Sequence, residues 1–147
     1  MEKYSKIVNY EDFQKDYIID RGIYRGHEYV VRWCGSHPCA YVKPRCHLSD
    51  DQIYDIPVHG GITYCGWWPS FGDSEIFEGS KHFVGWDYMH RGDYITSEFE
   101  DYYNEKVITK KYTYEEIMKD IKKVINHLCI LRASYKDLML FDRLGGK

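Results

Sequence analysis

The sequence predicts an α+β fold, in which an antiparallel sheet packs against a long helix in the C-terminal half of the chain. Short runs of β-branched and aromatic residues, separated by Gly, Ser and Pro, fill the middle of the chain and are typical of strands. Apolar residues then recur at helical spacing after Thr113. With 147 residues and neither an internal repeat nor a linker, the chain forms one domain, 1–147. Its expected parts are an N-terminal helical segment at 1–25, a sheet region at 26–112 and a helical part at 113–147.

The opening segment has the pattern of a short helix at residues 10–17. Asn9 is a suitable N-cap, and Phe13 and Tyr17 stand four positions apart on one apolar stripe. We therefore expect the chain to begin with a helix that precedes the sheet.

The sheet region begins where the hydrophobic period changes, after Gly26. The runs 28–33 and 40–43 are rich in β-branched and aromatic residues, and a Gly-Ser-His-Pro turn separates them, which predicts a hairpin. The elements expected next are a loop at 44–57, a strand at 58–65, an excursion at 69–80, a strand at 82–88, a loop with one helical turn at 91–105 and an edge strand at 107–111.

The late helix has the clearest signal in the chain. Thr113 and Glu116 form a capping-box pattern, in which each side chain satisfies an amide at the start of the helix. One apolar face follows, made by Ile117, Ile121, Val124, Leu128 and Leu131. Residues 134–144 are expected to form a second, short helix.

Composition and charge exclude several classes of function. A net charge of −3 argues against a general grip on nucleic acid or on an anionic membrane. No apolar run has the length of a signal peptide or a membrane span, so we expect a cytoplasmic protein.

The five cysteines are an odd number, which favours free thiols in a reducing compartment over a disulfide framework. Cys34, Cys39 and Cys46 lie close in sequence to His37 and His47, which raises the alternative of a structural zinc site. Their spacings do not match the paired Cys-x-x-Cys ligands that zinc usually takes. We therefore expect buried free cysteines and no metal.

Two glycine-containing segments carry the candidate functional residues. Residues 58–64 read Val-His-Gly-Gly-Ile-Thr-Tyr, and residues 85–94 read Gly-Trp-Asp-Tyr-Met-His-Arg-Gly-Asp-Tyr. Glycine weakens a strand, so glycines beside titratable groups indicate places where something approaches the backbone closely. The candidate site consists of His59, Thr63, Asp87, His90 and Asp93.

Alternation along strands predicts how these residues would meet. If residues 58–65 form a strand, His59, Gly61 and Thr63 share one face, and Gly85 and Asp87 share a face of the later strand. Paired strands would then leave a shallow trough between the two glycines. His90 and Asp93, from the loop that follows, would close one end of this trough.

The residue types suggest acid–base chemistry. An imidazole beside a carboxylate is the usual arrangement of a general base, and two such pairs could instead hold a divalent metal. Backbone amides of Gly60 and Gly61 could bind phosphate. The purely structural alternative is that the same groups form turn hydrogen bonds and ion pairs.

Aromatic residues make up 17% of the chain, more than one small core needs. Such rings supply contact area at low entropic cost. Trp67, Trp68 and Tyr94 flank the two glycine-containing segments and are candidates to stack on a ligand. They could equally pack beneath a loop as a small satellite core.

These two segments resemble those of a family of small phage, prophage and bacterial proteins. Its members read His-Gly-Gly-(Leu or Ile)-Thr-(Tyr or Phe), followed by Gly-(Phe or Trp)-Asp-x-x-His-x-Gly-Asp, and residues 33–42 resemble the preceding hairpin of that family in a rearranged form. The resemblance covers residues 30–95. It implies a phage-related cytoplasmic protein in which the five polar residues act as one site, but it implies no reaction.

From these observations we expect a protein that binds a phosphate-bearing small ligand such as a nucleotide. Hydrolysis of that ligand, with His59 or His90 as general base and Asp87 as its orienting group, is left open, as are the cofactor and the oligomeric state. The alternative is a non-catalytic counter-defence protein that inhibits a host protein through exposed aromatic residues or sequesters a nucleotide signal.

Overall fold

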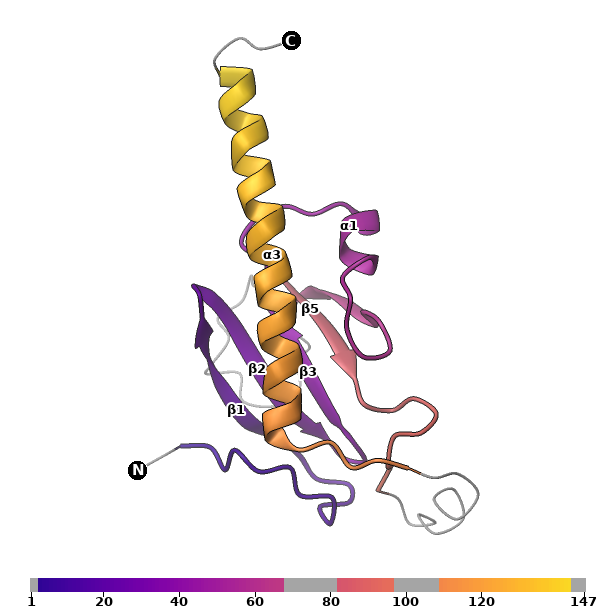
Figure 1. Ribbon diagram of the computed structural model, residues 1–147. Coiled ribbons are helices and arrows are strands. Elements are labelled where there is room, and N and C mark those ends of the chain that lie inside the picture. Colours follow the sequence, from indigo (N-terminus) through magenta and orange to yellow (C-terminus); the bar gives the residue numbers. More distant parts are fainter. Residues whose placement is uncertain (1–2, 68–81, 97–108, 144–147) are drawn as a thin grey trace.

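The computed structural model describes residues 3–67, 82–96 and 109–143, with only the backbone course given for Trp67 and for residues 134–143. Its centre is a five-stranded sheet in the order β1-β2-β3-β5-β4, in which every pair of neighbours is antiparallel (Figure 1). The strands are β1 Asp16–Tyr24, β2 His27–Cys34, β3 Pro38–Val42, β4 Tyr64–Trp67 and β5 His82–Asp87. The helices are α1 Asp50–Tyr54 and α3 Tyr114–Arg143.

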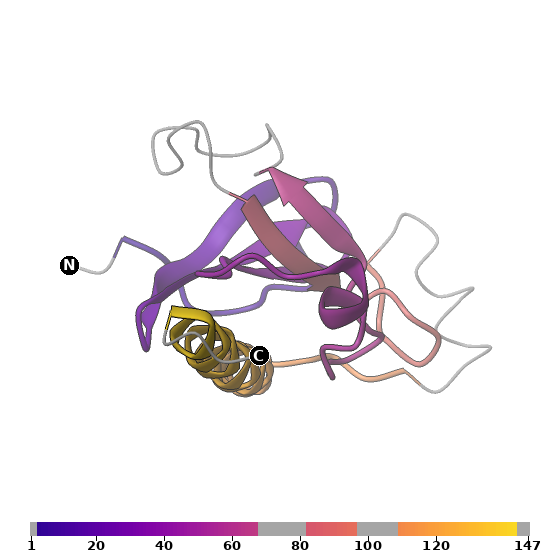
Figure 2. The ribbon, with the colours of Figure 1, turned by 90° about the horizontal axis from the view of Figure 1, so that it is seen from above.

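The long helix α3 crosses one face of the sheet, and α1 lies on the same side (Figure 2). This arrangement confirms the α+β class predicted from the sequence. The main core lies between the helix and the sheet, because side chains from both become almost fully buried there. Its helix side is made by Ile117, Ile121, Val124, Ile125 and Leu128, and its sheet side by Val31, Trp33, Ala40, Val42, Val84 and Trp86.

The opposite face of the sheet has a smaller apolar cluster. Val30, Cys39, Tyr41 and Phe83 are buried there, with Ile18 packed against them. The two clusters follow from strand alternation, since β2, β3 and β5 are buried on both faces.

The hairpin predicted around residues 34–38 is confirmed. The Cys34 amide donates to the His37 carbonyl over 2.9 Å and closes the turn between β2 and β3. Gly35 has φ +92°, the left-handed conformation that a two-residue hairpin turn needs at its first position.

The capping box of the long helix is also confirmed. The Glu116 amide donates to the Thr113 hydroxyl over 3.2 Å, and the Thr113 amide donates to the Glu116 carboxylate over 3.1 Å. The expected separate helix at 134–144 is wrong, because α3 continues without a break to Arg143. No Gly or Pro interrupts the chain between these segments, so nothing in the sequence ends the helix.

The expected opening helix at 10–17 is wrong. The Asn9 side chain accepts the Glu11 amide over 3.0 Å, which forms a local turn in place of a helix cap. Gln14 has φ +62°, outside the helical region, and β1 begins two residues later. Tyr17 lies in β1 and pairs with Trp33 of β2.

The other expectations for the sheet region need correction or fall in part outside the described residues. The loop at 44–57 contains α1, whose Ser49 and Gln52 form a second capping box. The strand expected at 58–65 begins only at Tyr64, because a turn occupies residues 58–61. Of the edge strand expected at 107–111, residues 109–111 contain a single bridge between Lys110 and Asp93. Residues 69–80, 97–105 and 107–108 lie outside the described residues.

Candidate functional site

A histidine and a carboxylate from distant parts of the sequence meet beside the end of β5. His59 lies in the turn at 58–61, which the Gly61 amide closes by donating to the Val58 carbonyl over 2.9 Å. Its Nε2 lies 2.7 Å from Asp93 Oδ2, and the Asp93 side chain is only 4% exposed. The same carboxylate oxygen accepts the His90 amide over 2.9 Å. Asp93 therefore connects the two segments of the candidate site.

A second histidine–carboxylate pair lies next to the first. His90 Nε2 is 3.3 Å from Asp87 Oδ1, close enough for an ion pair when the ring is protonated but without the alignment of a hydrogen bond. Asp87 also accepts the Thr63 hydroxyl over 3.1 Å and the Met89 amide over 3.1 Å. The His59 and His90 ring centroids are 5.6 Å apart, so the two pairs form one cluster.

The structure thus brings together all five polar residues predicted from the sequence. The expected route to this arrangement is wrong, because His59 lies in a turn and not on the face of a strand. The expectation that Asp87 lies beside the general base holds for His90 but not for His59. Asp93 orients His59, while Asp87 lies beside His90 and holds the Thr63 hydroxyl.

Gly60 is needed for protein packing. It has φ +69°, and a Cβ at this position would overlap the His90 imidazole. The close approach inferred from the glycines is therefore made by His90 of the protein itself. The proposed phosphate contact from Gly61 is wrong, because the Gly61 amide already donates to Val58.

The expected trough between Gly61 and Gly85 is not formed. Gly61 lies in the turn, and a Cβ on Gly85 would lie 2.6 Å from the Tyr41 ring. Because Tyr41 covers Gly85, this glycine makes room for a packed ring on the face of the sheet opposite the helix.

Aromatic side chains surround His59. Its ring stacks on Tyr88 with centroids 5.0 Å apart and planes 11° apart, and the Tyr112 centroid lies 4.8 Å away. The Tyr88 hydroxyl donates to Asp120 over 2.7 Å and accepts the Trp86 indole N–H over 3.0 Å. Burial raises the pKa of the Tyr88 and Tyr112 hydroxyls, so both are neutral donors near neutral pH.

His59 also lines a pocket of about 510 Å³ between its turn and α3. The helix contributes groups of both charges, and Asp120, which accepts the Tyr88 hydroxyl, is the only carboxylate among the lining residues. The lining residues are Pro57, Val58, His59, Asp120, Lys123, Asn126, His127 and Ile130.

Sequence reasoning missed the helix residues of this pocket. The sequence alone favours a solvated surface for Lys123 and gives no reason to select His127 or Tyr112. Their sequence separation from the glycine-containing segments is large, and only the packing of α3 on the sheet places them beside His59.

The aromatic candidates have mixed outcomes. The Tyr94 ring packs edge-on against Tyr10 with centroids 5.6 Å apart, and the Lys111 ammonium lies 4.4 Å from its centroid. These contacts support the satellite-core alternative for Tyr94. Trp67 belongs to β4, but its side chain is not described, and Trp68 lies outside the described residues.

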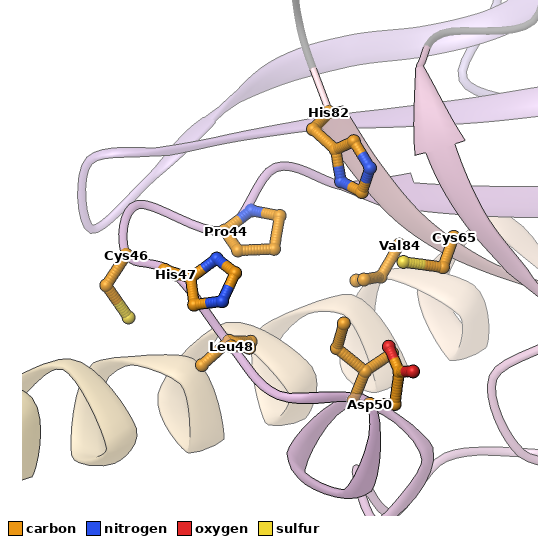
Figure 3. A pocket seen from close by; sticks show the side chains of 9 residues that line it. Pro44, Cys46, His47, Leu48, Asp50, Cys65, His82 and Val84 are labelled. Carbon is orange, nitrogen blue, oxygen red and sulfur yellow. The ribbon is translucent and has the colours of Figure 1, made fainter.

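A second pocket, of about 460 Å³, lies away from these pairs, between the β4–β5 end of the sheet and the segment that enters α1 (Figure 3). His82 and Cys65 line it from the strands, and His47 and Asp50 from the opposite side. It is mostly apolar, and it provides a control region for experiments on the candidate site.

The positions of possible ligand atoms bear on the two metal sites considered from the sequence, one at the cysteines and one at the histidine–carboxylate pairs. Each of the five cysteines is a free thiol in the described structure, as their odd number predicted, but of the five only Cys39 is buried and the expectation of buried cysteines is wrong for the other four. Among the side chains that the structure describes, which end at residue 133 in the long helix, one group of His, Cys, Asp or Glu places three ligand atoms within 4.8 Å of one another. That group is Cys34, His37 and Cys39. Among the described residues, the two histidine–carboxylate pairs do not form such a group.

Fold and site together define a small α+β protein with two adjacent histidine–carboxylate pairs. Comparisons with models of known protein families, with curated proteins and with solved structures find no match to this chain. Within the described part of the chain, no helix has the length and apolar character needed to cross a membrane.

Proposed function

We propose that this protein binds a phosphate-bearing small ligand, such as a nucleotide, in the pocket between His59 and α3. The observation that carries this proposal is the position of His59, which contacts the buried Asp93 on one side and lines the pocket on the other.

The charges around the pocket suit an anion. Lys123 and His127 line it together with His59, so one ammonium and two imidazoles face the same space. Phosphate oxygens accept hydrogen bonds from such groups, and those bonds are stronger than neutral ones. The negative charge of Asp120 disfavours an anion in the pocket, but its carboxylate accepts a hydrogen bond from the Tyr88 hydroxyl.

The His59–Asp93 pair also has the arrangement of a general base. Asp93 accepts from Nε2–H and thereby favours the tautomer in which Nδ1 has a lone pair. The nearest partner of Nδ1 is the Tyr112 hydroxyl at 3.4 Å, a weak contact that a water molecule can replace. In the hydrolytic form of the proposal, Nδ1 takes a proton from water as the water oxygen bonds to phosphorus, and the bond from phosphorus to the leaving phosphate oxygen breaks. The leaving phosphate departs as an anion, and the imidazole then releases its proton to solvent.

As part of the proposal, this activity would take place in the cytoplasm of an infected cell, which is what a resemblance to phage and prophage proteins implies. The same pocket would serve a protein that sequesters a nucleotide signal without cleaving it. The alternative of an aromatic surface that inhibits a host protein relies on Trp67, Trp68 and surface tyrosines, of which Tyr54 is exposed.

The test compares His59→Ala and His90→Ala with His47→Ala, which alters the second pocket. Binding of ATP and of inorganic pyrophosphate is measured by isothermal titration calorimetry on folded protein. We expect His59→Ala to weaken binding at least tenfold, about 1.4 kcal/mol, because it removes a group that lines the pocket. His47→Ala should stay within about twofold of wild type. Equal affinity in all four proteins would contradict the proposal.

Turnover separates hydrolysis from sequestration. Asp93→Asn keeps the shape of the side chain but no longer favours the reactive His59 tautomer. If the protein is a hydrolase, we expect this variant to lose phosphate release by at least about 100-fold while ligand binding changes much less. Tight binding by wild type without any product would instead support sequestration.

A further inference from the structure

The turn between β2 and β3 gathers three metal-binding side chains. Cys34 is the last residue of β2, His37 directly precedes β3, and Cys39 is the second residue of β3. The turn is held by the hydrogen bond from the Cys34 amide to the His37 carbonyl and by the left-handed conformation of Gly35. The backbone thus fixes all three side chains at one end of the hairpin.

The separations of the ligand atoms suit a tetrahedral ion. The two Sγ atoms and an imidazole nitrogen lie within 4.8 Å of one another. Zinc–sulfur and zinc–nitrogen bonds imply ligand atoms about 3.6–3.8 Å apart, so a closure of at most about 1 Å completes the site. Rotations of the three side chains would supply this closure.

Burial and a supporting hydrogen bond favour the same group. Cys39 is 6% exposed, and Cys34 and His37 are half-buried. The Ser36 hydroxyl lies 2.6 Å from His37 Nδ1 and holds the ring, as an outer partner does for most metal-binding histidines.

A metal ion binds the neutral form of an imidazole and displaces the protons of the thiols that it binds. Arg32, the cross-strand neighbour of Cys39, would offset part of the negative charge of two thiolates.

We propose that Cys34, His37 and Cys39 bind one Zn²⁺ ion through two thiolates and one imidazole, with water in the fourth position. Thiolate and imidazole ligands select zinc over magnesium and calcium, which prefer oxygen. Binding displaces the two thiol protons to solvent and requires no change of oxidation state. Asp87 stands opposite Cys39 in the β3–β5 register, so the ion would lie close to the candidate site, although the two proposals stand independently.

The sequence analysis missed this group because it compared the spacings between cysteines with the Cys-x-x-Cys motif and did not consider a histidine between two cysteines as a ligand. Cys46, the third cysteine considered, lines the pocket of Figure 3 and is not part of the group. His37 takes its place as the third ligand, in the pattern Cys-x-x-His-x-Cys.

The test is a titration of the full chain, reduced and metal-free, with Co²⁺ as a coloured substitute for Zn²⁺. We expect one equivalent of Co²⁺ to produce thiolate-to-cobalt charge-transfer absorption and the intense visible bands of tetrahedral cobalt, and one equivalent of Zn²⁺ to bleach them. Cys34→Ser and Cys39→Ser should lose the charge-transfer band, whereas the control variants Cys46→Ser and Cys65→Ser should keep it.

Because Cys39 is buried and its replacement could unfold the protein, His37→Asn provides a second variant at a half-buried position. Circular dichroism confirms that this variant is folded, and its Zn²⁺ affinity is measured by competition with a chromophoric chelator. We expect an affinity loss greater than about 100-fold, more than loss of an outer partner causes. Three results would overturn the proposal: no charge-transfer band in folded wild type, unchanged affinity in His37→Asn, or loss of the band only in Cys46→Ser or Cys65→Ser.

Discussion

At the scale of single residues, Gly60 allows the segment 58–64 to pack against His90 of the segment 85–94. Its left-handed conformation turns the chain so that His59 points toward Asp93, and its missing side chain leaves room for the His90 ring. The neighbouring Gly61 has φ +78°, but apart from its chain neighbours no described atom lies within 4 Å of the place that a Cβ would take. A substitution at Gly61 therefore tests backbone strain alone, whereas a substitution at Gly60 tests backbone strain together with packing against His90.

We expect Gly60→Ala to destabilise the protein more than Gly61→Ala. Both variants force alanine into the left-handed region, which costs about 1–2 kcal/mol. Gly60→Ala adds a clash with His90, for which overpacking of about 1–3 kcal/mol is typical. Urea unfolding monitored by circular dichroism measures the difference. Equal losses in the two variants would show that His90 does not pack on Gly60.

At the scale of elements, α3 both buries the core and supplies one wall of the candidate pocket. Its start is fixed by the reciprocal hydrogen bonds of Thr113 and Glu116, and Tyr112 directly precedes this cap and contacts His59. The position of the helix start therefore affects both stability and the environment of the imidazole.

We expect Thr113→Ala to lower the free energy of unfolding by about 1 kcal/mol, because an amide in the first turn loses its acceptor. Lys119→Ala, at an exposed position of the same helix, is the matched control and should change it by less than about 0.5 kcal/mol. Thermal and urea unfolding measure both variants. If they behaved alike, the capping box would contribute nothing to stability.

The sequence predicts elements well where one local signal decides the structure. The hairpin follows from Gly35 and its flanking β-branched runs, and the helix start follows from Thr113 and Glu116. The expected opening helix fails because the Asn9 side chain forms a turn and Gln14 adopts a positive φ. The Gln14 amide also donates to the Gly35 carbonyl, a contact with the hairpin that hydrophobic periodicity does not reveal.

The sequence predicts which residues form the candidate site but not how their side chains are arranged. Glycines beside titratable residues identify His59, Asp87, His90 and Asp93, which the structure brings together. His59 pairs with Asp93 because residues 58–61 form a turn, whereas the alternation of residues along this segment predicts a strand. The pocket residues of α3 could not be found, because their position depends on how the helix packs on the sheet.

At the scale of the whole molecule, His27 makes stability depend on pH. It is 1% exposed, its Nδ1 lies 2.9 Å from the Lys43 carbonyl, and its Nε2 has no partner among the described residues. Burial, followed by the charges of Arg45, Arg132 and Arg25, lowers its pKa against the opposing hydrogen bond. Protonation would add a buried N–H without an acceptor, so the unfolded chain binds this proton more readily.

We therefore expect the free energy of unfolding to fall as the pH drops below about 6.5, the value for histidine in an unfolded chain. A folded-state pKa below the unfolded value gives stability that is present at neutral pH and lost on acidification. His27→Asn keeps a donor for the Lys43 carbonyl but cannot titrate, so its stability should fall less steeply between about pH 7.5 and 5.5. Identical slopes in urea unfolding would exclude His27 as the cause.

The most direct test of the proposed site is a long-range ¹H–¹⁵N correlation spectrum of the histidine rings during titration with ATP. We expect the His59 and His127 resonances to shift together with a single dissociation constant, because both rings line the pocket beside α3. The His47 and His82 resonances, from the second pocket, should stay unchanged. Shifts confined to His47 and His82, or no shift of His59 at millimolar ATP, would contradict the proposal that His59 and α3 form the binding site.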